Sequence, residues 1–447
     1  MSTALSTAIS LSLEYDAAEH ETLPHVVKFS GGRSSGMMLM LLLEQGLLDP
    51  QRGDVVVFNN TSAEHPATYD FVRACSRFAE NEYGIPFFWI EYATYEDAHN
   101  GEWTRRASYR LVNERPYSES NPAGYRWRGE VFEELVSHQG FLPSRHTRIC
   151  TTHLKLRATN EFLAEWFAGK DATEWRGHFH PEPQMTDEAV IARHRRSRGK
   201  LNDAELLRKK AFLRSRPPAL PEQNFADFSR VCAQHLPNEV FAERGYPEFA
   251  PMTGESATEY VSLIGLRADE PRRVARVMSR NHLGSSDPER TKRAMTDGEI
   301  VCTPLADAGV GNDDVLSYWE DRDWKLALPP DANLSNCVFC FMKGTCAIPN
   351  VRRDVAAANA VLPEELRSVP DTPSDIHWWV DLEARYKRRP LKRYKGRGRR
   401  SQKKVTIGFW GVDADLTYRD LTELNDDELM EREGFSGEAA LPCDCTD

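Results

Sequence analysis

The stretch HVVKFSGGRSSGMMLMLLL, residues 25–43, decides the fold. Its first five residues predict a short buried strand, and the apolar run from Gly36 onward predicts a helix. Gly31 and Gly32 lie between them, and both can adopt positive φ, which lets the backbone come close to a bound anion. Ser34 or Ser35 is expected to cap the helix, whose first N–H groups attract phosphate. The pattern predicts a nucleotide-binding turn, with an ordinary glycine-rich turn as the alternative.

The region that follows alternates between strand and helix patterns. A β-branched run, a helical pattern and two further apolar runs predict three more strands and a helix, at residues 54–61, 66–83, 85–90 and 260–266. This order predicts an α/β fold with a doubly wound parallel sheet. Ligands of such sheets bind beyond the carboxyl ends of the strands. Ser30 and residues 59–61 are therefore expected to face one pocket.

Composition limits the class of protein. The chain has 447 residues, enough for two or three domains or for one large domain with insertions, and 40% of them are hydrophobic, which suffices for a core. No run approaches the ~20 apolar residues that span a bilayer, and residues 1–22 lack the pattern of a secretory signal. We expect a cytoplasmic protein with no membrane partner. Its nine cysteines are then expected to serve metal binding or catalysis rather than disulfides.

Shifts in composition predict four segments. These are a flexible tail, an α/β domain with two irregular or helical insertions, a cysteine-cluster module, and a basic tract followed by an acidic tail, at residues 1–22, 23–330 (insertions at about 95–145 and 170–255), 331–384 and 385–447.

The loop from Ser30 to Ser35 is neither a Walker A loop nor a dinucleotide-binding G-x-G-x-x-G. It resembles the S-G-G-x-D-S loop of the N-type ATP pyrophosphatases (the PP-loop, adenine nucleotide alpha hydrolase-like superfamily), and most of all their phosphoadenylyl-sulfate (PAPS) reductase-like branch. Ser34 stands where that loop has Asp. The resemblance implies that ATP or a PAPS-like nucleotide binds, with Mg²⁺, at the loop residues Ser30, Gly31, Gly32, Arg33, Ser34 and Ser35.

Four later segments resemble the same family in the same order. Residues 59–69 are similar to its D-T-G-x-x-F/H-P-E-T stretch, residues 147–156 to R-x-C-T-x-x-L-K, residues 265–273 to G-x-R-x-x-E-S-x-x-R, and residues 303–318 to its closing P-L-x-x-W-x-x-x-D-V-x-x-Y segment. The resemblance implies a nucleotide pocket lined by Asn60, Thr61, Glu64 and Arg267. For residues 59–69 a capped helix start is the alternative.

The segment around Cys150 suggests reactive chemistry. Arg148 and Lys155 would hold phosphate or sulfate oxygens, Arg148 as a planar fork and Lys155 as a point charge. Cys150 is either a catalytic thiolate activated by these cations and His153, or a buried structural cysteine.

A second cluster of cysteines has metal-ligand spacing. Cys337, Cys340 and Cys346 form C-x2-C-x5-C, and Cys302 is favoured over Cys150 as a fourth ligand. Four thiolates complete a [4Fe–4S] cluster or a zinc site; unmetallated core cysteines are the third interpretation. The apolar neighbours favour iron–sulfur. The resemblance to DndC-type sulfurtransferases of DNA phosphorothioation, which carry such a cluster, supports that choice.

The end of the chain separates its charges. Residues 385–404 contain twelve Lys or Arg with interleaved Tyr and Gly, and residues 405–447 contain twelve Asp or Glu. Such a basic tract can neutralise DNA or RNA phosphates and stack on bases, or it can be a solvated loop paired with the acidic tail. Cys443 and Cys445 are either a mobile redox pair or part of a frayed tail.

Together these features predict an enzyme. It would bind ATP and activate a substrate by adenylylation for sulfur transfer, with nucleic acid as a candidate acceptor and a cysteine desulfurase as a candidate sulfur donor. One alternative is a reductase of PAPS or a related sulfonucleotide. The other is a non-catalytic sensor of nucleotide and nucleic acid.

Overall fold

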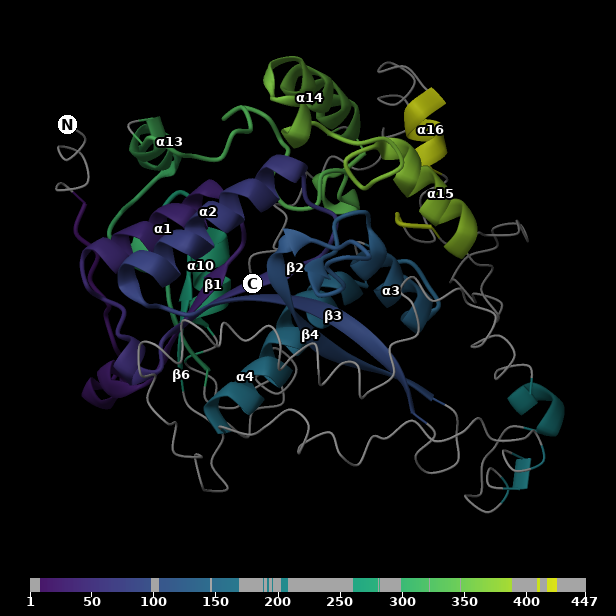
Figure 1. The fold of residues 1–447 in the computed structure, drawn as a ribbon, viewed down its shortest axis with the longest axis horizontal. Coiled ribbons are helices and arrows are strands. Elements are labelled where there is room, and N and C mark those ends of the chain that lie inside the picture. Colours follow the sequence, from purple (N-terminus) through teal and green to yellow (C-terminus); the bar gives the residue numbers. More distant parts are fainter. Residues whose placement is uncertain are drawn as a thin grey trace, which may run out of the picture.

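A computed structural model describes residues 9–97, 104–144, 147–168, 188, 191–192, 195, 202–207, 260–279, 281, 299–320, 322–345, 347–387, 408–410 and 416–423. Within these residues the protein has an α/β fold, a seven-stranded, mostly parallel mixed sheet flanked by helices (Figure 1). The strand order is β5-β4-β3-β2-β1-β6-β7.

The other strands lie on both sides of β1 in the sheet. The strand bounds are His25–Phe29 (β1), Val55–Asn60 (β2), Phe87–Asp97 (β3), Thr104–Pro116 (β4), Gly124–Tyr125 (β5), Tyr260–Ile264 (β6) and Glu299–Cys302 (β7). Val27 of β1 lies between Val56 of β2 and Leu263 of β6, both parallel to it. The chain therefore reverses its direction of progress across the sheet at β1 and β6, and a crevice opens beyond the carboxyl ends of strands at such a point.

Alternate side chains of the central strands pack into two layers. Val27 and Phe29 lie in one core with α1 (Arg33–Glu44) and α2 (Pro66–Tyr83). Val26 points the other way, into a core with Phe162 of α4 (Ala158–Ala168). Both faces are apolar because each strand is covered on both sides, which is why these strands read as continuous Val and Phe runs.

The remaining helices continue this arrangement. Their bounds are Ala18–Thr22 (η1), Pro50–Arg52 (η2), Glu130–Gln139 (α3), Thr151–Arg157 (η4), Pro271–Met278 (α10), Pro304–Asp307 (α12), Asn312–Glu320 (α13), Phe341–Lys343 (η6), Ile348–Val361 (α14), Glu364–Leu366 (η7), Ile376–Tyr386 (α15) and Tyr418–Glu423 (α16).

The region predicted as an irregular insertion, residues 95–145, is mostly regular. β3 and β4 form a long antiparallel hairpin, with register from Trp89 opposite Val112 to Asp97 opposite Thr104 (Figure 1). It makes the sheet mixed rather than wholly parallel. The prediction failed because Arg105, Arg106 and Arg110 interrupt β4, so its hydrophobicity alone does not indicate a strand.

The N-terminal segment differs from the predicted loose tail over its described residues, 9–22. The backbone N–H of Leu11 donates to Oε1 of Gln45 (2.9 Å), and Nε2 of Gln45 donates to the carbonyl of Ile9 (2.9 Å). The Tyr15 hydroxyl meets Nε2 of His25 at 2.7 Å. These contacts fix the segment against α1 and β1.

The cysteine-rich segment is not set apart from the sheet by a core of its own. Among the described residues, Phe339, Ile376 and Trp379 belong to the same hydrophobic cluster as α1 and α2. Cys346, Cys443, Cys445, most of the predicted insertion at 170–255 and residues 388–404 lie outside the described part, so predictions that depend on them stay predictions.

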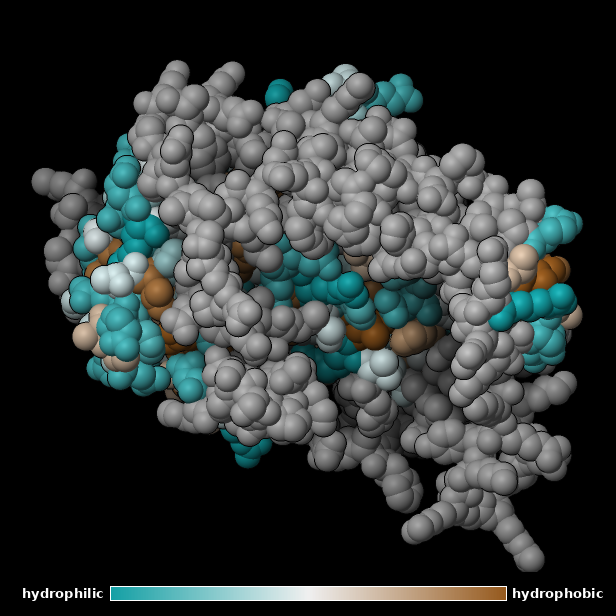
Figure 2. Space-filling model, turned by 90° about the horizontal axis from the view of Figure 1, so that it is seen from below, coloured by the Kyte–Doolittle hydropathy of each residue, from teal (hydrophilic) through white to brown (hydrophobic). Residues whose placement is uncertain are grey.

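The described surface is largely polar in one view. Figure 2 shows that hydrophilic side chains predominate among the described residues of that face, with hydrophobic ones in small groups between them. No helix in the described residues is long and apolar enough to cross a membrane.

Candidate functional site

The turn between β1 and α1 needs one glycine for its backbone. Gly31 has φ of 79°, a left-handed value that side chains rarely adopt. A Cβ there would also lie 3.0 Å from Cγ2 of Thr68. Gly32, which could also adopt positive φ, has φ of −96°. Gly31 alone makes the bend that brings the chain back over the strand end.

The serines of the loop tie the turn together rather than cap the helix. The N-cap of α1 is Gly32, with no side-chain cap, which corrects the prediction for Ser34 or Ser35. The Ser35 hydroxyl donates to the carbonyl of Gly32 (3.0 Å) and accepts from the N–H of Ser30 (3.2 Å). The first N–H groups of α1 are therefore left without a side-chain acceptor, as an anion site requires.

Arg267 reaches this helix start from the loop after β6, the strand next to β1. It follows β6, and its Nη1 donates to the hydroxyl of Ser34 at 3.1 Å. The approach is close because residue 265 is glycine: a Cβ there would lie 2.9 Å from Cα of Ser35. A guanidinium, 23% exposed, thus lies beside the positive end of a helix, and a bound anion would be attracted by both.

Arg33 does not point into this site. Its Nη2 donates to the carbonyl of Leu326 (3.2 Å) and to that of Leu328, while the Arg33 carbonyl accepts from Nε1 of Trp319 (2.9 Å). Burial lowers the pKa of its guanidinium. The Arg33 side chain therefore fixes residues 326–328 against α1. That Arg33 binds nucleotide as part of the loop stays a prediction.

The residues at the end of β2 form a buried network. The Thr61 hydroxyl donates to Oε1 of Glu64 (2.7 Å), and the Tyr69 hydroxyl donates to Oε2 of Glu64 (3.0 Å). Nδ2 of Asn60 donates to Glu91 (2.7 Å). Asn60, Thr61 and Glu64 are all buried, and His65 is the N-cap of α2. The predicted nucleotide pocket at these three residues stays a prediction.

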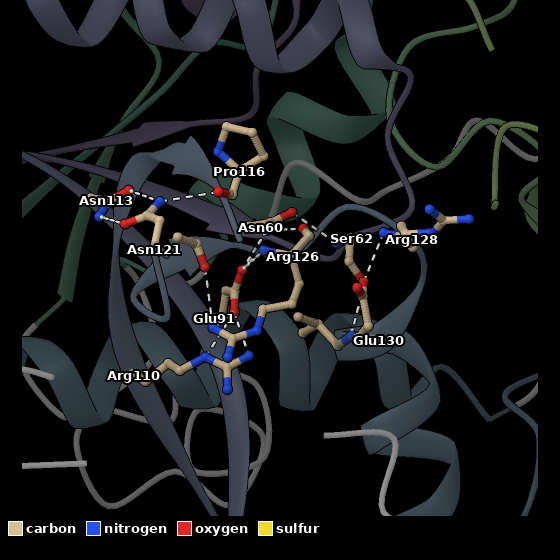
Figure 3. A network of polar contacts seen from close by, with 12 residues as sticks. Asn60, Ser62, Glu91, Arg110, Asn113, Pro116, Asn121, Arg126, Arg128 and Glu130 are labelled. Carbon is tan, nitrogen blue, oxygen red and sulfur yellow. Dashed lines mark hydrogen bonds and ion pairs between the residues drawn. The ribbon is translucent and has the colours of Figure 1, made fainter. Parts of the chain in front are cut away.

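Sequence reasoning missed a buried charge cluster beside Asn60 (Figure 3). Nε and Nη2 of Arg110 donate to Oε2 of Glu91 at 2.8 and 2.5 Å, and the N–H of Arg126 donates to Oε1 at 2.6 Å. Burial, and then the charge of Arg110, lower the pKa of Arg126 to about 10. The signal was present: Glu91 is a carboxylate inside the otherwise apolar run FFWIEY.

The segment around Cys150 lies near the same edge of the sheet. It opens a π-helix, η4, that contacts β2, β3 and α3. Nδ2 of Asn59, in β2, donates to the Thr159 hydroxyl just after η4 (2.8 Å). π-Helical turns are frequent at functional sites. Cys150 is partly exposed, whereas the other described cysteines are buried.

Two of the four predicted metal ligands lie against the end of β2. Sγ of Cys337 is 3.4 Å from the Thr61 hydroxyl, and the N–H of Val338 donates to the carbonyl of Ala63 (3.0 Å). The N–H of Cys340 donates to the carbonyl of Cys337 (3.3 Å), so both thiols belong to one tight turn. The sheet end and the cysteine turn are thus in direct contact.

Cys302 lies elsewhere, which corrects its place in the set. Its Sγ faces the carbonyl of Glu14 at 3.6 Å, and burial raises its pKa to about 12. Within the described residues no three His, Cys, Asp or Glu side chains form a group that could hold a metal. The thiols of Cys337 and Cys340 suit a soft metal, but two thiols do not complete the four ligands of a zinc site or a [4Fe–4S] cluster.

The two glycines of the loop give a matched pair of variants. Gly31→Ala should lower the free energy of unfolding by about 1–3 kcal/mol, because it combines positive φ with a crowded Cβ. Gly32→Ala should change it by less than about 1 kcal/mol, since its Cβ would meet only the Ser30 hydroxyl at 3.6 Å. Urea denaturation of both variants checks this, and equal losses would contradict the assigned turn.

Comparison with known proteins gives no match. No protein-family model matches the chain, and neither a curated protein nor a solved structure does.

Proposed function

We propose that this chain is an ATP pyrophosphatase of the PAPS reductase-like type. It would bind ATP at the turn after β1 and activate a substrate by adenylylation for sulfur transfer. The observation that supports this most is the contact between Arg267 and Ser34, which joins two segments across the point where the sheet changes direction. We include in this proposal that the sheet and its helices have the adenine nucleotide alpha hydrolase-like fold.

The residues of the chain would act by position and charge. The N–H groups at the start of α1 and the Arg267 guanidinium would bind phosphate oxygens. Charge that develops on departing pyrophosphate would be stabilised by the same groups, already fixed before reaction. Asp269 accepts from Nε of Arg267 at 2.8 Å and orients it. Mg²⁺ bound with the nucleotide would add neutralisation of the phosphates.

The cysteine turn, residues 337–340, supports the part of the proposal that concerns sulfur transfer. Cys337 and Val338 contact the loop that follows β2, so a cluster or a sulfur carrier at this turn would lie near the strand ends. A [4Fe–4S] cluster is the preferred occupant and zinc the second, with Cys346 as a further ligand. The tract 385–404 would recruit DNA or RNA, and a cysteine desulfurase would supply sulfur.

Arg267→Gln should weaken ATP binding by about ten- to a hundredfold, because a charge-assisted bond to phosphate contributes about 1.5–3 kcal/mol. Arg272→Gln, an exposed arginine of the same segment, is the matched control and should bind ATP as the parent does. Calorimetric titration measures both, and a coupled assay follows pyrophosphate release.

The outcomes separate the interpretations. Equal affinity of the Arg267 and Arg272 variants would overturn the site. Normal ATP binding without pyrophosphate release, with any acceptor offered, would favour the non-catalytic sensor.

The exposure of Cys150 favours a second candidate, reduction of PAPS or a related sulfonucleotide. Cys150 is the partly exposed thiol among the described cysteines, as a nucleophile toward sulfur requires. Arg148 and Lys155 flank it in sequence. Sulfite release from PAPS in the presence of a thiol donor, lost in Cys150→Ser, would establish this function in place of the first.

A further inference from the structure

A short C-terminal segment, residues 408–410 and 416–423, packs on the cysteine turn. The Tyr418 hydroxyl donates to the carbonyl of Phe339, one of the two residues between Cys337 and Cys340. Tyr418 is fully buried. Both thiols lie near enough to Tyr418 to raise the pKa of its phenol, although burial is the larger cause. One hydroxyl therefore meets the turn at its centre.

A single carboxylate holds this segment in place at two points. Oε2 of Glu383, in α15, accepts from the N–H of Tyr418 at 2.7 Å, and Oε1 accepts from the N–H of Phe409 at 3.2 Å. Glu383 is 2% exposed. Gly408 allows the close approach, because a Cβ there would collide with Oε1 of Glu383. The carboxylate satisfies two buried backbone donors that would otherwise be costly.

Aromatic side chains complete the contact. The rings of Phe341 and Phe409 are stacked with centroids 5.4 Å apart, and the rings of Trp410 and Tyr418 are 4.5 Å apart. Tyr418 also packs on Trp379 of α15, at 5.6 Å. The segment thus brings its own apolar surface to the turn, and all of these rings are buried.

We propose that Tyr418 is a positioning residue for the thiol pair. Held by Glu383, it fixes the Phe339 carbonyl and with it the conformation of the Cys337–Cys340 turn, and the segment around it keeps both thiols from solvent. The two thiols are thereby presented together for a soft metal ion. The proposal concerns the thiols themselves and holds whether or not the chain releases pyrophosphate from ATP.

Site-resolved alkylation of the full chain tests this. The reduced protein, treated with a chelator, is exposed to iodoacetamide, and mass spectrometry follows the rate at each cysteine. Tyr418→Phe removes only the hydroxyl and should speed modification of Cys337 and Cys340 about five- to tenfold. Cys75, fully buried in α2, reports global opening and should keep its rate.

A matched control removes the hydroxyl of a different tyrosine, which is partly buried. Tyr386→Phe, on α15, deletes a bond to Oε1 of Glu133 (3.0 Å) and should leave all the rates unchanged. Glu383→Gln should act in the same direction as Tyr418→Phe, since its amide donor would face one of the two N–H groups. Unchanged rates at Cys337 and Cys340 in Tyr418→Phe, or an equal rise at Cys75, would overturn the proposal.

Discussion

Glu91→Gln should lower the free energy of unfolding by about 3–5 kcal/mol, the usual cost of removing one partner of a buried ion pair. Glu91, Arg110 and Arg126 are at most 2% exposed, so the two guanidiniums would keep their charges with no carboxylate between them. The glutamine amide would also place a donor against Arg110 on one side, or against Nδ2 of Asn60 and the N–H of Arg126 on the other.

An exposed ion pair supplies the control for Glu91. Glu114 pairs with Arg77 at 2.6 Å, but the side chains are 27% and 58% exposed. Glu114→Gln should therefore cost less than about 1 kcal/mol. Guanidinium denaturation of the parent and both variants gives the comparison. A loss at Glu91 no larger than that at Glu114 would show that the buried cluster contributes no more than a surface pair.

Acid should destabilise the protein between pH 6.5 and about 4 through two buried histidines. Burial lowers the pKa of both His25 and His65 to about 4. Above pH 6.5 both are neutral in the folded and unfolded chains, and their contribution is fully present. As the pH falls further, the unfolded chain takes up protons first, so stability is lost, by about 3 kcal/mol per histidine at pH 4.

The hydrogen bonds of His65 explain why it stays neutral. Its Nδ1 accepts from the N–H of Ala67 (3.2 Å), so Nε2 carries the proton toward the Ser368 hydroxyl (3.1 Å). His65→Asn retains an acceptor for the N–H of Ala67 but cannot titrate. Its unfolding free energy should depend less on pH in this window than that of the parent. His377→Asn, at an exposed histidine, should show the parental slope; equal slopes in all three would exclude His65 as the cause.

The parts of the fold that were predicted correctly have strong local signals. β1, β2 and α2 lie close to their expected ranges, because β-branched runs and amphipathic periods are set by burial of the same residues. Gly31 was predicted for the right reason, since a turn with φ of 79° selects glycine. The resemblance implied that Arg267 binds nucleotide; the structure shows its contact with Ser34, and the binding itself stays a prediction.

The errors share a cause, which is contact between residues distant in sequence. Nothing near Arg33 indicates that its guanidinium would be used by the carbonyls of Leu326 and Leu328. Likewise, Cys302 was favoured as the fourth ligand but lies in an edge strand of the sheet against Glu14. The spacing of residues in the sequence predicts which side chains can meet on one turn. It does not predict which distant segments come together in the fold.

The hydrogen bond between Val338 and Ala63 joins the cysteine-rich segment to the loop after β2. Residues 331–384 contribute to the same hydrophobic cluster as α1 and α2. A fragment that ends near residue 330 would therefore expose apolar side chains of α1 and α2 to water. The turn between β1 and α1 and the cysteine turn therefore belong to one cooperative folding unit, and we expect neither to fold alone as a shorter version of the protein.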